Sequence, residues 1–116
     1  MREVVVLGAG LHRYGVFPEK DIVALGTEAI TMALKDAGVS WEDIEGAYCG
    51  TVQQTLSTGH RICNRMGLTG LAITNIENAS ASGSSAFREA YLAVACGVHD
   101  IALAFGADKL NASPFR

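Results

Sequence analysis

The chain has 116 residues, of which 49% are hydrophobic and 18% charged, and its formal net charge is −3. This length suits one domain, and the charged fraction lies below the roughly 25% of a typical soluble domain. A small acidic net charge without a basic run gives no support to nucleic acid as a partner. The apolar excess is what we expect of a fragment, or of a subunit that buries much of its surface against a partner.

Targeting and metal signals are missing from the sequence. No apolar run approaches the roughly 18 residues of a membrane span, and the N-terminus lacks the small-residue cleavage site of a signal peptide. Cys49, Cys63 and Cys96 form no C-x-x-C pair, so we predict neither a disulfide framework nor a metal site. A reducing cytoplasm is the expected compartment.

The first predicted element is a buried strand over Glu3–Leu7, which ends in Gly8-Ala9-Gly10. A dinucleotide-binding loop needs a third glycine, but Arg13 stands at that position. The two glycines therefore predict a tight turn out of the strand, followed by a loop to Lys20.

A helix is predicted from the N-cap Asp21 to about Ala37, with Gly38 as its C-terminal stop. One apolar face of this helix is expected to pack on a sheet. Its members are Ile22, Leu25, Ala29, Met32 and Ala33.

Shorter elements follow in the middle of the chain. Ser40 is the expected cap of a short turn over Trp41–Ile44, which leads to a second strand over Gly46–Gly50. Residues 51–59 are polar and predict a loop, and Arg61–Met66 predicts a short helix.

The third strand is predicted over Ala72–Glu77, followed by a helix from about Gly83 to Cys96 that Gly97 closes. A fourth strand is expected over Ile101–Phe105, and a loop over Asn111–Arg116. Strands that alternate with helices predict the α/β class, with a mainly parallel sheet between helices.

Small polar residues occupy the predicted strand-to-helix junction, and Ser80 stands at its tip. The free N–H groups of a helix's first turn bind and stabilise negative charge there, which suits nucleophilic acyl transfer. Alternatively, Ser80, Ser82 and Ser84 are N-cap candidates only. The G-x-S-x-G form of a hydrolase elbow is absent because position 78 is Asn, so the spacing alone leaves both interpretations open.

The segment Glu77-Asn78-Ala79-Ser80-Ala81-Ser82-Gly83-Ser84-Ser85-Ala86 resembles the nucleophile segment of the thiolase superfamily, in its sterol-carrier-type (SCP2-like) branch. In that family the nucleophile is a Cys at the position of Ser80. Further stretches that fit the family are Asp36–Ile44, Ala47–Gly50, Gly67–Gly70 and Ala102–Leu110. The resemblance covers nearly the whole chain but only the first part of a thiolase.

The resemblance implies a thiolase-like layered fold, with residues 1–116 as a partial N-terminal domain. Four strands of the first half would be present, whereas that half's last strand and the whole second half would be missing. It also implies Claisen or retro-Claisen acyl transfer on acyl-CoA thioesters, with coenzyme A as part of the substrate and no permanently bound cofactor. A homodimer that pairs across a two-fold axis at the edge strand Ala72–Glu77 is implied as well.

Ser80 is the departure from the family. A hydroxyl ionises far less readily than a thiol and needs a positioned general base. His12, His60 and His99 match no family motif, because the family's catalytic histidines belong to its C-terminal half. We expect all three to be surface or loop residues. Ser80 is then an engineered replacement, the mark of a natural relative that has abandoned acyl transfer, or a slow nucleophile.

Two other functions stay open. One is a retro-aldolase that acts on a CoA thioester with a steroid side chain and works with an OB-fold partner subunit. The other is a non-catalytic fragment that binds lipid or a partner. Cys49 is a conceivable substitute nucleophile, but we expect it, Cys63 and Cys96 to be small buried hydrophobes. Lys109 and Arg116 either meet CoA phosphates or are solvated.

Overall fold

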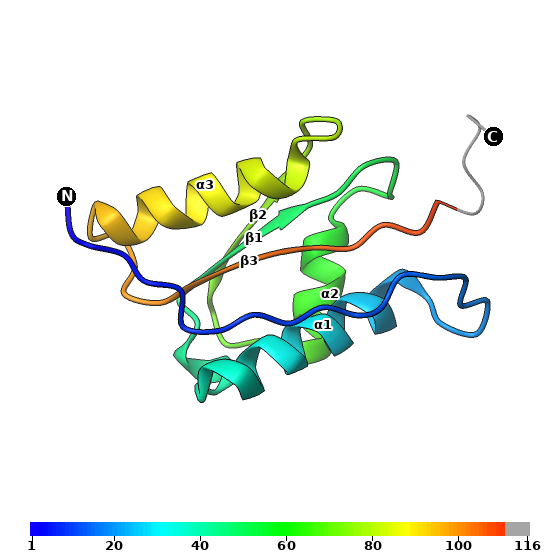
Figure 1. Ribbon diagram of the computed structural model, residues 1–116, viewed down its shortest axis with the longest axis horizontal. Coiled ribbons are helices and arrows are strands. Elements are labelled where there is room, and N and C mark those ends of the chain that lie inside the picture. Colours follow the sequence, from blue (N-terminus) through cyan, green and yellow to red (C-terminus); the bar gives the residue numbers. More distant parts are fainter. Residues whose placement is uncertain (111–116) are drawn as a thin grey trace.

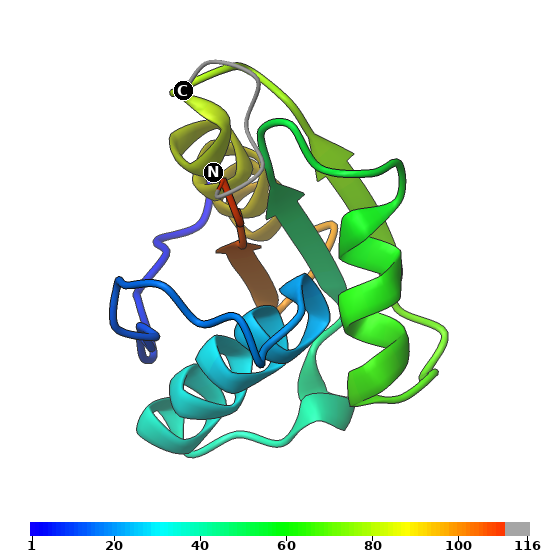
Figure 2. The same cartoon turned by 90° about the vertical axis from the view of Figure 1, so that its right-hand side faces the viewer.

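A computed structural model describes residues 1–110 of the chain. Its elements are α1 (Ile22–Ala37), the short 3-10 helix η1 (Trp41–Asp43), β1 (Gly46–Gly50), α2 (Thr58–Met66), β2 (Ala72–Ile76), α3 (Ser82–Ala95) and β3 (Ala102–Gly106) (Figure 1). The strands form one parallel sheet in the order β2-β1-β3. Figure 2 shows the sheet between α3 on one side and α1 with α2 on the other. The predicted α/β class and parallel sheet are confirmed.

Helix α1 has the predicted caps. The Asp21 carboxylate accepts a hydrogen bond from the Ala24 N–H at 2.8 Å, and Gly38 has a φ of 71°, a conformation that glycine adopts at little cost. The buried face of α1 is rotated from the predicted one, since Met32 is 43% exposed whereas Ile30 is 1% exposed. The main core lies between α1, α2 and the sheet and comprises Ile22, Val23, Ile30, Trp41, Ile44, Ala47, Ile62 and Cys63.

Helix α2 begins at Thr58, three residues before the predicted start at Arg61. Its first turn receives a partner from the sheet, because the Gly59 N–H donates to the side-chain oxygen of Asn75 at 2.7 Å. A helix start fixed by a residue of β2 leaves no local sequence signal.

The predicted strand over Glu3–Leu7 is wrong, because these residues belong to no strand. The chain instead crosses from the end of α3 at Arg2 to the end of α1, and runs beside α1 from Gly8 on (Figure 1). A Cβ added at Gly8 would lie 2.5 Å from the Ala37 nitrogen, and one at Gly10 would lie 2.4 Å from the Ala33 nitrogen. The two glycines therefore permit close approach to a helix rather than a tight turn. Residues 3–7 pair with no other strand, and Val5, Val6 and Leu7 are exposed.

Arg2 anchors the start of this segment at the far end of α3. Its backbone N–H donates to the Ala95 carbonyl at 2.8 Å, and its guanidinium donates to the carbonyls of Val94 and His99. The same side chain pairs with Asp100 at 2.8 Å. These bonds satisfy C-terminal carbonyls of α3 that lack partners within the helix.

Helix α3 packs closely on the sheet because its buried face is made of small residues. These are Ser82, Ala86, Ala90, Ala93 and Ala95. At one end a Cβ added to Gly50 would lie 2.4 Å from the Ser82 carbonyl oxygen, so the end of β1 touches the first turn of α3. The strands and α3 lie within a residue of their predicted bounds, and the predicted loop over Asn111–Arg116 is outside the described residues.

We expect Gly50→Ala to lower the free energy of unfolding by about 1–3 kcal/mol, because the new methyl group would meet backbone that must shift. Gly83 is a matched control, since a Cβ there meets no atom within 4 Å. We expect Gly83→Ala to raise stability by up to about 1 kcal/mol. Urea unfolding measures both, and an equal loss in the two variants would contradict the close contact.

Candidate functional site

Ser80 lies in the connection between β2, which ends at Ile76, and α3, which begins at Ser82 (Figure 1). This is the strand-to-helix turn that the sequence predicts. Ser80 is exposed, and its hydroxyl has no hydrogen-bond partner within residues 1–110. The side chain therefore faces solvent at the amino end of α3.

The buried hydroxyl of Ser82 closes this turn. Ser82 is 3% exposed, and its Oγ accepts from the Asn78 N–H at 2.7 Å and donates to the Ala79 carbonyl at 2.7 Å. Ala79 has a φ of 49°, a left-handed conformation that is strained for alanine. The Glu77 carboxylate accepts from the Ala79 N–H, so both polar groups of the strained residue have partners.

The N-cap interpretation of the serines is not confirmed. Ala81 is the N-cap of α3, and it makes no side-chain cap hydrogen bond. Ser84 donates to the Ala81 carbonyl at 3.1 Å, whereas the Ser82 hydroxyl hydrogen bonds to the backbone of Asn78 and Ala79, which precede it in the turn. The first turn of α3 thus keeps N–H groups directed at the turn, where the helix dipole favours negative charge.

No histidine hydrogen bonds to Ser80 in the part of the chain that the structure describes. The Nδ1 atom of His12 lies 2.8 Å from the Arg13 carbonyl. His60 pairs with Asn75, whose amide nitrogen lies 2.9 Å from the His60 Nδ1. His99 covers Gly46 at the start of β1, the opposite end of the sheet from Ser80. An unassisted hydroxyl at a helix end is a weak nucleophile.

The cysteines divide into two kinds. Cys49 and Cys63 are buried as predicted, and burial raises the pKa of the Cys49 thiol to about 12 and that of Cys63 to about 11. Neither thiol is reactive near neutral pH. Cys96 was expected to be buried, and this is wrong, because it is the exposed C-cap of α3.

Of the two candidate phosphate-binding residues, Lys109 lies within the described part of the chain. Lys109 donates to the backbone carbonyls of Phe17, at 3.1 Å, and Lys20, so its ammonium group is occupied by the loop before α1. Arg116 lies outside the described residues. In residues 1–110 no group of three or more His, Cys, Asp or Glu side chains could hold a metal ion, and no helix there has the length and apolarity to cross a membrane.

Sequence reasoning missed an acidic residue at this end of the sheet. Asp108, just after β3, accepts from the Val52 N–H in the loop after β1 at 2.8 Å. Partial burial raises the pKa of the Asp108 carboxyl, although hydrogen bonds from Val52 and Gln54 act in the opposite direction. The two partners are 56 residues apart, so no local pattern could have paired them.

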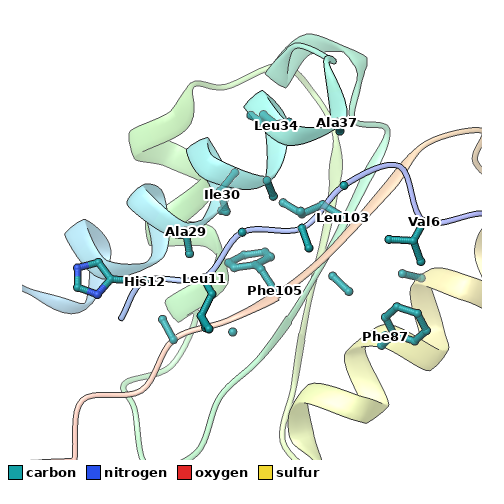
Figure 3. Close-up of a pocket in the computed structure, with 18 of the residues that line it drawn as sticks. Val6, Leu11, His12, Ala29, Ile30, Leu34, Ala37, Phe87, Leu103 and Phe105 are labelled. Carbon is teal, nitrogen blue, oxygen red and sulfur yellow. The ribbon is translucent and has the colours of Figure 1, made fainter. Parts of the chain in front are cut away.

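A large apolar cavity, here called the slot, lies between residues 3–11 and β3 (Figure 3). Its volume is about 1070 Å³. Side chains from four elements line it, among them Val6, Ala29, Leu34, Phe87, Leu103 and Phe105. Ser80 is not among its lining residues, so the slot and the candidate nucleophile are separate.

We expect Ser82→Ala to lower the free energy of unfolding by about 1–3 kcal/mol, because it leaves the Asn78 N–H without its partner and removes one of the two hydrogen bonds to the Ala79 carbonyl. Ser84→Ala is the matched control, since Ser84 is exposed and makes one bond to a helix carbonyl. We expect a change within about 0.5 kcal/mol there. Similar losses in thermal unfolding of both variants would contradict the role given to Ser82.

Known proteins resemble this chain in sequence. It is 35% identical over 116 residues to the acetyl-CoA acetyltransferase of Methanocaldococcus jannaschii, which covers 96% of this chain and 30% of the relative. It is also 35% identical over 112 residues to sterol carrier protein 2 of Gallus gallus, covering 94% of this chain and 20% of that protein. The chain therefore spans less than a third of the length of these relatives.

The fold is similar to that of the 3-oxoacyl-[acyl-carrier-protein] synthase III from Aquifex aeolicus VF5, with a TM-score of 0.74 at 21% identity. The likeness covers 91% of this chain and 35% of that one. The family model described as "Thiolase, N-terminal domain" matches residues 4–116. Sequence and fold agree, and the chain belongs to the thiolase family, whose N-terminal domain it matches.

Proposed function

We propose that residues 1–116 are the nucleophile-bearing part of a thiolase-type acyltransferase that acts on acyl-CoA thioesters by Claisen or retro-Claisen chemistry. The observation that carries the proposal is the position of Ser80, which is exposed at the tip of the β2–α3 turn, two residues before the first residue of α3. A thioester substrate with coenzyme A is supported by the relatives named acetyl-CoA acetyltransferase. No permanently bound cofactor is part of the proposal.

The chemistry of this turn favours an anion. An acyl group on the residue at position 80 would have its carbonyl oxygen near the first-turn N–H groups of α3, which can stabilise the oxyanion of a tetrahedral intermediate. No basic side chain hydrogen bonds to the Ser80 hydroxyl in residues 1–110, so we propose that acyl transfer is impaired relative to a Cys. The general base and acid would come from the C-terminal half, as the family resemblance implies.

A non-catalytic binding role is the second candidate. The observation that favours it is the Ser80 hydroxyl, which has no hydrogen-bond partner among the described residues and therefore no activation. Several relatives are named sterol carrier protein 2, which is compatible with lipid binding. The retro-aldolase with an OB-fold partner stays a prediction from the sequence.

We also propose a homodimer that forms through β2. This strand lies at the edge of the sheet, and three of its five residues are exposed. An exposed edge strand carries unpaired backbone N–H and C=O groups, which invite pairing with another strand. Antiparallel pairing of two copies would cover the edges and bring the two β2–α3 turns close to one interface.

We expect the chain to run in light scattering at twice its mass of 12.2 kDa. A charge at the exposed Thr74 of β2 should weaken the pairing, so Thr74→Lys is expected to shift the population toward monomer. Thr31→Lys, on the exposed face of α1, is the matched control. A monodisperse monomer at working concentration would contradict the dimer.

We expect the 116-residue chain to have no thiolase turnover, and Ser80→Cys alone not to create it. The helix end should lower the pKa of a thiol at position 80 from about 8.5 toward 3.5–7.5, which gives rapid stoichiometric alkylation. Turnover also needs acid–base help worth about 10²–10⁴-fold, which the described residues do not supply. Iodoacetamide labelling and thiolysis of acetoacetyl-CoA with CoA measure the two properties separately.

The native cysteines are internal controls for this labelling. With a pKa of about 12, Cys49 is about one part in 10⁴ thiolate at pH 8 and should stay unlabelled until the chain unfolds, as should Cys63. The exposed Cys96 should label at the rate of an ordinary thiol. If position 80 is labelled no faster than Cys96, the proposed site is wrong. Full thiolysis by this chain would mean that the catalytic groups lie inside it.

A further inference from the structure

The loop over residues 51–57 joins β1 to α2 at the same end of the sheet as Ser80. Its first residue is tied to the strand that leads into the Ser80 turn, because the Thr51 N–H donates to the Ile76 carbonyl at 3.2 Å. Gly50, immediately before the loop, abuts the Ser82 carbonyl. The loop therefore starts against both ends of the turn that carries Ser80.

Asp108 holds this loop from the other side. Its Oδ1 atom accepts from the Val52 N–H at 2.8 Å. The Gln54 side chain reaches the carbonyls of Val52, at 3.4 Å, and Lys109, at 3.5 Å. The loop is thus joined to the residues after β3 by hydrogen bonds at Asp108 and Lys109.

The negative charge of Asp108 is directed at the Val52 N–H and not at a cation. The neighbouring Lys109 directs its ammonium group to carbonyls of the loop before α1, and Asp108 makes no salt bridge within residues 1–110. A hydrogen bond to an ionised acceptor is stronger than one between neutral groups. The Asp108 carboxylate is therefore a strong hydrogen-bond acceptor for the Val52 N–H.

The loop backbone contains strained residues, which need such a hydrogen bond to hold them in place. Gln53 and Ser57 have φ values of 58° and 61°, left-handed conformations that are uncommon for residues other than glycine. Strained residues of this kind persist only where surrounding contacts determine them. Gln53 adjoins Val52, so the bond to Asp108 acts directly beside a strained residue.

We propose that Asp108 is a positioning residue for reaction at position 80. It fixes Val52, the adjacent Thr51 fixes the Ile76 carbonyl, and Ile76 is the last residue of β2 before the turn. Loss of the carboxylate would loosen the loop and the base of the turn, and the residue at position 80 would lose its alignment with the amino end of α3. This inference rests on the proposed function, which makes position 80 the reacting position.

The test uses the Ser80→Cys chain and adds Asp108→Ala or Asp108→Asn. The first readout is hydrogen exchange at the Val52 amide, and the second is the iodoacetamide labelling rate at position 80 divided by that at Cys96. Asp36→Ala is the matched control, because Asp36 accepts a backbone N–H, that of Ala9, at 2.9 Å near the opposite end of the sheet. The ratio within one molecule removes differences in global stability.

With Asp108→Ala we expect Val52 exchange to rise about tenfold or more, the effect of losing one charge-assisted hydrogen bond. The labelling ratio should fall about threefold or more. Asp108→Asn keeps an acceptor oxygen but loses the charge, so both values should lie between those of Asp108→Ala and those of the Ser80→Cys parent. Asp36→Ala should change neither.

An unchanged labelling ratio with faster Val52 exchange would overturn the proposal, because Asp108 would then fasten the loop without influencing position 80. An equal fall in the ratio with Asp36→Ala would overturn it as well. Failure of the proposed function gives a different result. In that case the Ser80→Cys parent itself labels no faster at position 80 than at Cys96.

Discussion

The contact between Gly50 and the first turn of α3 is the constraint on which the candidate site depends. Only a residue without a side chain allows the Ser82 carbonyl to approach the end of β1 so closely. The helix end is thereby held directly on the sheet, and the connection from β2 must turn sharply to reach it. The strained Ala79 and the exposed Ser80 follow from that geometry, and the buried Ser82 hydroxyl supplies the bonds that compensate the turn.

Features with local signals could be predicted from the sequence. Asp21 and Gly38 bound α1, and the change from β-branched to helical periodicity located the turn at Ser80. Features that depend on distant partners could not. The start of α2 is set by Asn75 from β2, and the loop after β1 is fastened by Asp108 from β3. The valine run after Arg2 has the composition of a strand, but a strand exists only where another backbone pairs with it.

The slot accounts for part of the apolar excess in the composition. Phe87 of α3 is 56% exposed, and Tyr91 beside it also lines the cavity. Burial of such side chains is worth about 25 cal/mol per Å² of apolar surface, so the slot leaves a large hydrophobic stabilisation unrealised in this chain. Residues 3–11 form one wall of the slot. Arg2 holds one end of this wall at α3, and Lys109 holds the loop before α1 at the other end. The wall is therefore fixed without any sheet hydrogen bonds between residues 3–7 and β3.

The size of the electrostatic effect decides whether the amino end of α3 can ionise the residue at position 80. A charge at a helix end gains typically 0.3–1 kcal/mol, and up to about 2 kcal/mol in partly buried geometry, while one pKa unit corresponds to about 1.4 kcal/mol. The helix dipole alone therefore moves a pKa by about one unit, and first-turn N–H bonds add to this. A thiol that starts near 8.5 is thereby brought close to neutral pH and carries a substantial thiolate fraction, whereas a hydroxyl starts far above that range. The same turn that would suit a thiolate leaves the Ser80 hydroxyl protonated, and its geometry rather than its present side chain carries the likeness to an acyl-transfer site.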